Sequence, residues 1–123
     1  MAQTGVHHVA HRETVEADVA DITRYLEDTL GPKLVAHLAG VENARTVARW
    51  ANGERRPRTD SEERLRCAYY VFRILNEVES SHTVRAWFAG MNPLLDEKAP
   101  VGVIRAGRFE DVVAAAKAFV ADG

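Results

Sequence analysis

The chain has 123 residues, a formal net charge of −2 and an apolar share of 46%, which predicts one compact domain or two small lobes that share a core. No apolar run approaches the roughly 20 residues that cross a bilayer, and no secretory signal opens the chain, so we expect a cytoplasmic protein with no membrane association. The single cysteine, Cys67, excludes an internal disulfide, and its neighbours favour a buried structural thiol.

The first twelve residues lack apolar periodicity, so residues 1–12 are predicted to form a flexible N-terminal tail. His7 and His11 would share one helical face, and two imidazoles at that spacing can bind a metal ion. No cysteine, aspartate or glutamate joins them at an obvious ligand spacing within this segment. A polar tail that holds no metal is therefore the favoured interpretation.

Three helices are expected in the next part of the chain. The spacing of Val15, Val19, Ile22 and Leu26 indicates an amphipathic helix, whose acidic opposite face should point away from DNA or toward a basic partner. Two short helices follow, and each has its own start and stop signals. Those signals are, in chain order, Pro32, Gly40, Asn43 and Gly53. Helix, glycine-containing turn and helix is the outline of a helix-turn-helix, whose second helix reads the major groove of DNA.

The second of these short helices has an apolar face with Val47 and Trp50 and a basic face with Arg45 and Arg49. Residues 45–58 hold five arginines and one glutamate, a local net charge of +4, so the rest of the chain sums to −6. A basic island on an acidic chain favours DNA contact over the alternative, a surface helix with solvated arginines. The predicted DNA-binding residues are Arg45, Thr46, Arg49, Asn52, Arg55, Arg56 and Arg58. Arg45 is expected to read guanine, and the arginines from Arg49 onward to contact phosphates.

The rest of the chain is also read as helical. A capping box, Thr59 with Glu62, is predicted to open the longest helix, whose apolar stripe runs through residue 78 or so. Ser80 or Ser81 can cap the next helix, which carries Val84, Trp87 and Phe88 inward and ends at Gly90. A short helix from Pro100 stopped by Gly107, and a final helix from about Phe109, complete the chain. No stretch alternates with the period of a strand, so the fold is predicted to be all-α.

The second half also carries a set of motifs, Trp87-Phe88, Asn92-Pro93-x-Leu95, then Pro100, Gly107 and Val112. Together with the helix-turn-helix ahead of it, this set resembles the Xre/MbcA/ParS family of bacterial antitoxins over about residues 15–120. Two departures stand out. Asp96 and Glu97 lie where the family often has a glycine pair, and Val101, Gly102, Val103 and Ile104 lie where it often has Leu-Asp-Leu-Leu.

The resemblance implies a type II antitoxin in two parts, with no enzymatic activity and no cofactor. The part over residues 13–58 would bind operator DNA and repress its own operon. The part over residues 59–123 would dimerise, and would bind and silence a RES-domain toxin that degrades NAD. Several relatives insert their C-terminal end into the toxin's active site, which implies that the C-terminal region here covers that site. The implied toxin-binding residues are Phe109, Val113, Lys117, Phe119, Val120, Asp122 and Gly123. A homodimer, or a larger assembly built with the toxin, is expected.

Several alternatives stay open from the residues alone. The main alternative function is a stand-alone helix-turn-helix regulator whose C-terminal half dimerises. A small enzyme is the least favoured interpretation, because the sequence shows no recognisable set of catalytic residues and no glycine-rich phosphate-binding loop. Asn92-Pro93 is first a turn signal, and Trp87 and Phe88 are first core residues. Phe119 and Val120 are core residues in the competing interpretation of the last helix.

Overall fold

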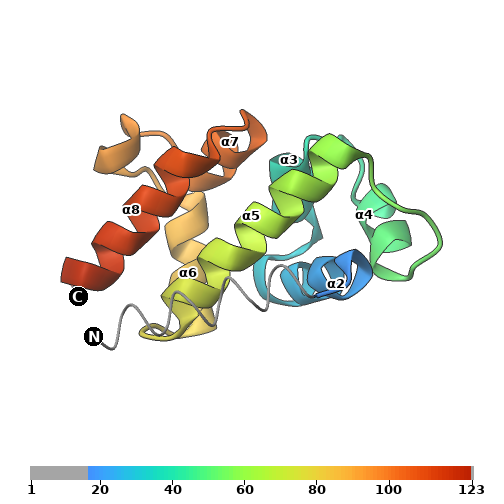
Figure 1. The fold of residues 1–123 in the computed structure, drawn as a ribbon, viewed down its shortest axis with the longest axis horizontal. Coiled ribbons are helices and arrows are strands. Elements are labelled where there is room, and N and C mark those ends of the chain that lie inside the picture. Colours follow the sequence, from blue (N-terminus) through green and yellow to red (C-terminus); the bar gives the residue numbers. More distant parts are fainter. Residues whose placement is uncertain (1–16, 123) are drawn as a thin grey trace.

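The structure is a computed structural model that describes residues 17–122, and this part of the chain is built from helices (Figure 1). The elements are α2 (Val19–Leu30), α3 (Pro32–Ala39), α4 (Ala44–Ala51), α5 (Thr59–Asn76), α6 (Ser81–Ala89), the 3-10 helix η1 (Pro93–Leu95), α7 (Pro100–Arg105) and α8 (Phe109–Asp122). Between residues 17 and 122 no strand forms, and the β-pairing there is an isolated bridge between Asn92 and Lys98. The all-α prediction is confirmed.

Most of the predicted helix signals act where they were expected. The Asn43 side chain accepts the Arg45 N–H at 2.8 Å and caps α4, and Ser80 accepts the Thr83 N–H at 3.2 Å and caps α6. Pro32 and Pro100 open α3 and α7, where a missing N–H costs no helical hydrogen bond. Gly40 follows α3 with a φ of 86°, in the left-handed region that glycine takes without steric cost.

Two expectations about α5 are wrong. Thr59 and Glu62 form no capping box, because Thr59 is already the first helical residue and the cap, Arg58, makes no side-chain capping bond. The Glu62 carboxylate instead accepts hydrogen bonds from Arg56 and from Arg66, each with a shortest distance of 3.0 Å. Charged guanidinium donors compete better for a carboxylate than a neutral backbone N–H does.

The apolar stripe of α5 also ends earlier than predicted. The helix stops at Asn76, and Val78 lies beyond it with 54% of its surface exposed. The helical period therefore does not carry Val78 to the core side, and this valine becomes part of the molecular surface.

Helix α5 runs through the middle of the molecule and packs against helices from both halves of the chain (Figure 1). Helices α2, α3 and α4 pack on one another toward one end of α5, and α6, α7 and α8 lie toward the other. The two groups also touch directly, because α3 packs on α7 and α2 on α6. The predicted boundary between residues 58 and 59 stays a prediction, although the core is continuous across it.

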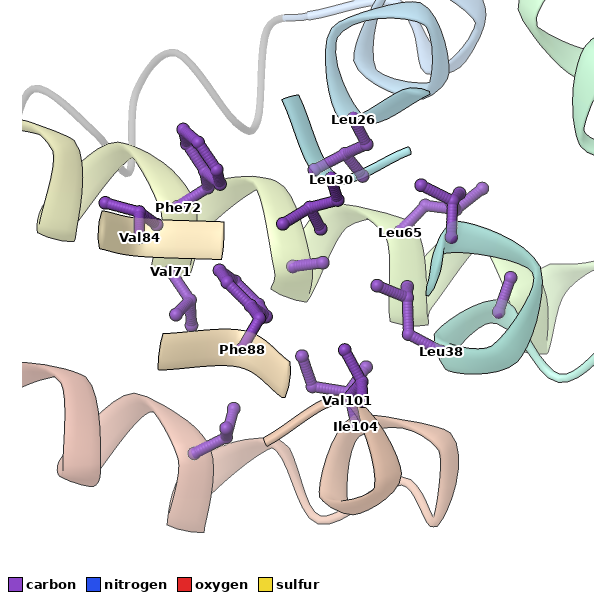
Figure 2. Close-up of a cluster of buried hydrophobic side chains, with 14 of the residues drawn as sticks. Leu26, Leu30, Leu38, Leu65, Val71, Phe72, Val84, Phe88, Val101 and Ile104 are labelled. Carbon is purple, nitrogen blue, oxygen red and sulfur yellow. The ribbon is translucent and has the colours of Figure 1, made fainter. Parts of the chain in front are cut away.

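Large apolar side chains from α2, α3, α5, α6 and α7 point toward one another in this core (Figure 2). Phe72 of α5 belongs to this core and is fully buried. Its ring packs edge-on against Tyr25 of α2 at 5.5 Å and stacks on Phe88 of α6 at 6.0 Å, measured between ring centroids. These are favourable aromatic geometries, so one side chain couples the first and second halves of the chain.

Side chains distant in sequence satisfy the carbonyl groups at the helix ends. Arg24 donates to the Ala51 carbonyl at the end of α4, and Arg105 donates to the His37 carbonyl in α3, both at 2.8 Å. Ser61 donates to the Ala39 carbonyl, also at 2.8 Å. Terminal carbonyls lack intrahelical partners and carry partial negative charge, so these donors fix α3 and α4 in place. Within residues 17–122, no helix is long and apolar enough to cross a membrane.

Candidate nucleic-acid and protein interfaces

Helix α4 is anchored by the face that the sequence marked as apolar. Val47, Trp50 and Ala51 are all buried, and Trp50 keeps only 4% of its surface exposed. The turn over residues 40–43 joins α3 to α4, and these two helices pack against each other. Both also pack against α2, and α3 packs against α5 as well. A buried Trp and a capped C-terminus give α4 a fixed orientation, so the side chains on its outer face are held in defined positions.

The outer face of α4 and the loop that follows carry the predicted DNA-binding residues. Arg45, Arg49, Asn52, Arg55, Arg56 and Arg58 are all exposed, and Thr46 is half-buried. Asn52 donates to Glu54 at 3.2 Å, and Arg56 pairs with Glu62. Arg45, Arg49 and Arg55 form no ion pair with any residue between 17 and 122. Their positive charge is therefore not neutralised by a direct partner in that part of the chain.

Arg55 and Arg56 lie where the loop passes the beginning of α2. With Asp18, Trp50 and Gly53 they line a shallow pocket of about 270 Å³. The Asp18 carboxylate already caps α2 there by accepting the Ala20 N–H at 3.1 Å. The arginines, rather than the helix N-terminus, are thus the groups that could hold an anion at this place.

The residues of α8 that the resemblance implies for toxin binding differ widely in exposure. Lys117 and Asp122 are exposed, Phe109, Val113 and Phe119 are half-buried, and Gly123 lies outside the described residues. Val120 keeps only 4% of its surface exposed and belongs to the hydrophobic core. The position of Val120 therefore fits the competing interpretation of this side chain, in which it stabilises the fold.

The sequence did not predict which large apolar residues would be exposed. In the described part of the chain the exposed large hydrophobic side chains are Val78 (54%), Met91 (77%) and Leu94 (65%). All three line one open cavity of about 530 Å³. Its other lining residues are Glu79, Ala86, Trp87, Gly90, Asn92, Pro93, Ala115, Phe119 and Asp122. One signal was available in the sequence, because Met91 and Leu94 flank a turn-forming Asn-Pro and no helical period directs them to a core.

Asn92 builds the turn that carries Met91 and Leu94. Its side-chain oxygen accepts the Leu94 N–H at 2.9 Å, and its backbone oxygen accepts the N–H groups of Leu95 and Glu97, each at 2.9 Å. Its N–H donates to the Lys98 carbonyl at 3.2 Å. Asn92 is buried, so these bonds satisfy polar groups that water does not reach. The turn interpretation of Asn92-Pro93 is confirmed.

The single cysteine, Cys67, is partly buried and packs against the hydrophobic core. Desolvation by burial raises the pKa of the Cys67 thiol to about 12, which keeps it protonated and poorly nucleophilic at neutral pH. Over residues 17–122, no group of histidine, cysteine or acidic side chains is arranged to hold a metal ion. The predictions for His7 and His11 and for the tail over residues 1–12 fall outside the described residues.

The fold and its surfaces define a small all-α protein with an arginine-rich surface on one half and an apolar groove on the other. This chain is 33% identical over 70 residues to the mycobacterial cidal antitoxin MbcA of Mycobacterium tuberculosis, and equally to that of Mycobacterium bovis. The match covers 57% of this chain and 62% of the relatives, so it spans about three fifths of their length. No family model and no solved structure matches the chain. The resemblance to MbcA-type antitoxins is confirmed.

Proposed function

We propose that this protein is the antitoxin of a type II toxin–antitoxin system and that it binds and inhibits a RES-domain toxin that degrades NAD. The observation that carries the proposal is the 33% identity to the MbcA antitoxins over 70 residues. The class of the toxin comes from the wider resemblance of the Trp-Phe, Asn-Pro-x-Leu and later Pro and Gly motifs to the Xre/MbcA/ParS family.

The same protein represses its own operon through the α3–α4 unit. Support comes from the order of two short helices and a turn, and from arginines on the outer face of α4 that lack ion-pair partners between residues 17 and 122. Unpaired guanidinium groups on a rigid helix can contact base edges and phosphates without first breaking an internal bond. A homodimer, or a larger assembly with the toxin, would place two such helices on paired half-sites.

Inhibition is assigned to the C-terminal region, which would cover the toxin's active site. The exposed Lys117 and Asp122 near the end of α8 support this assignment, because they can form new contacts without unfolding the helix. Val120 would instead stabilise the fold of α8 through its contacts with the core.

Co-expression with the protein encoded next to this chain tests the proposal. Expression of the neighbour alone should stop growth and lower cellular NAD, and added expression of this chain should restore both. A neighbour that neither binds this chain nor lowers NAD would refute the toxin assignment. Promoter binding by this chain without any such partner would favour the alternative, a stand-alone helix-turn-helix regulator with a C-terminal dimerisation part.

A further inference from the structure

An apolar groove lies between α6, η1 and α8, on the half of the molecule away from the arginine-rich α4. Its exposed apolar side chains are Val78, Met91 and Leu94, and Trp87 and Phe119 line it as half-buried aromatics. Large apolar residues gathered in one concave place on a folded protein mark a surface that another molecule covers. Isolated exposed apolar residues would carry no such meaning, but here all of the large ones in the described part of the chain line a single cavity.

The groove is built on rigid supports. Trp87 packs edge-on against Phe88 with 5.4 Å between ring centroids, and Phe88 is fully buried. The hydrogen bonds of Asn92 hold the turn that presents Met91 and Leu94. Preformed pockets with an aromatic residue in their wall are the places where binding energy concentrates, because little conformational entropy is lost there on binding.

The charges in the groove select what can enter it. Its ionisable lining residues are Glu79 and Asp122, both acidic. A second copy of this chain would bring the same patch against itself in a two-fold dimer, and the interface would then hold four carboxylates and no basic lining residue, at the cost of like-charge repulsion. A segment with apolar side chains flanked by Lys or Arg would instead fill the cavity and neutralise both carboxylates.

We propose that this groove is the docking site for the toxin, and that the toxin segment that enters it carries apolar side chains flanked by basic residues. The inference rests on the proposed antitoxin function, and it adds a second contact surface to the end of α8. Phe119 and Asp122 belong to both regions, whereas Met91, Leu94 and Glu79 belong to the groove alone.

Leu94→Glu and Met91→Glu test the groove in the full-length protein. Both side chains are more than half exposed, so each variant should keep the melting temperature of the wild type. Each should weaken binding of the co-expressed toxin by about tenfold or more, because a charge would replace an apolar anchor. Ala106→Glu is the matched control, since Ala106 is exposed and does not line the groove. Glu79→Lys should weaken binding by a smaller factor and make it less sensitive to salt.

The outcomes separate the inference from the function on which it rests. If the wild-type chain does not bind the toxin at all, the proposed function fails. If the wild type binds while both glutamate variants stay folded and bind as tightly, the groove assignment is overturned. It is also overturned if the wild type is a dimer that the glutamate variants dissociate with toxin affinity unchanged, because the occupant is then a second copy.

Discussion

The α3–α4 region presents a basic surface to solvent, whereas the α6–η1 region presents an apolar groove. Each has a short helix with a Trp near its end, Trp50 in α4 and Trp87 in α6. Trp50 is buried beneath exposed arginines, whereas Trp87 is half-buried in the wall of an apolar groove. The helices themselves do not decide this difference. The segments that follow them do, because one is an arginine-rich loop and the other is a Met-Asn-Pro-Leu turn.

This contrast links the sequence to two kinds of recognition. A polyanion is attracted over a long range by unpaired guanidinium groups, and the attraction weakens as salt rises. An apolar groove acts only at contact, and its binding energy comes from desolvation. The antitoxin function proposed above requires contact with both DNA and a toxin, and keeping the two surfaces apart on one shared core would let both bind at once.

The largest expected effect tests whether the two regions share that core. Phe72→Ala should lower the free energy of unfolding by about 3–5 kcal/mol, because it leaves a cavity between α2, α5 and α6. Urea denaturation measures the change. In each of two variants, Trp50→Phe and Trp87→Phe, the fluorescence of the remaining tryptophan and the far-ultraviolet circular dichroism should report the same transition midpoint. Two separate midpoints would contradict a shared core and support independent folding of residues 13–58 and 59–123.

The next effect concerns the arginine-rich surface. Arg45→Ala should weaken specific promoter binding by about 1–3 kcal/mol if Arg45 reads a base, while the melting temperature stays unchanged because the side chain is exposed. Arg49→Ala should weaken it by less, as expected for a phosphate contact. Electrophoretic mobility shifts at several salt concentrations provide the measurement. Specific binding that ignores both substitutions would disprove the placement of DNA on α4.

Arg56 provides an internal control for that surface. It already pairs with Glu62 at 3.0 Å, so a phosphate must compete with this carboxylate for its guanidinium. Arg56→Ala should therefore cost less binding than Arg45→Ala and lower the salt dependence by about one unit of slope. An equal loss for the two variants would indicate that the Arg56–Glu62 pair breaks when DNA binds.

Two glycines that end the short helices allow a smaller, paired test. Gly40 and Gly53 have φ angles of 86° and 73°, so an alanine at either position is strained and should cost about 1 kcal/mol. A Cβ at Gly40 would also lie 2.8 Å from a guanidinium nitrogen of Arg64, whereas one at Gly53 meets nothing within 4 Å. Gly40→Ala should thus be the more destabilising in thermal melts. Equal losses would mean that Arg64 moves aside freely.

Helix periods and caps predicted the fold, since short-range signals such as Asn43, Ser80, Pro32 and Pro100 act within one turn of where they stand. The capping box at Thr59 failed because the helix begins at Thr59 itself, and the Glu62 carboxylate pairs instead with Arg56 and Arg66, one of them from outside the helix. Such competition depends on tertiary structure, which local patterns do not record.

For the same reason, the sequence predicted the arginine-rich surface of α4 but not the apolar groove. Exposure of the α4 arginines follows from the face opposite Trp50, so periodicity alone located them. The groove needed the arrangement of α6, η1 and α8 in space, because Val78, Met91 and Leu94 belong to no common helical face. Val120 lies on an apolar face of α8 that is wide enough to serve either a core or a partner, and only the packing places it in the core.

The smallest expected effect has the opposite sign and concerns the turn beside the groove. Asp96 and Glu97 have φ angles of 56° and 66°, in the left-handed region, at the place where the antitoxin family it resembles often has a glycine pair. Glutamate is disfavoured there by about 1–2 kcal/mol, and aspartate by less because it takes this conformation more readily. Glycine removes the strain but gives up about 0.5–1 kcal/mol of conformational entropy.

Glu97→Gly should therefore raise the free energy of unfolding by up to about 1 kcal/mol, and Asp96→Gly should change it less. Lys98→Gly is the matched control, because Lys98 is exposed in the same loop but has no positive φ. That substitution brings only the entropic cost and should lower stability by about 0.5–1 kcal/mol. The urea denaturation midpoints of the three variants measure these changes in stability. A loss in Glu97→Gly as large as in Lys98→Gly would show that the turn stores no strain, and that the two acidic residues fit its backbone as well as glycine does.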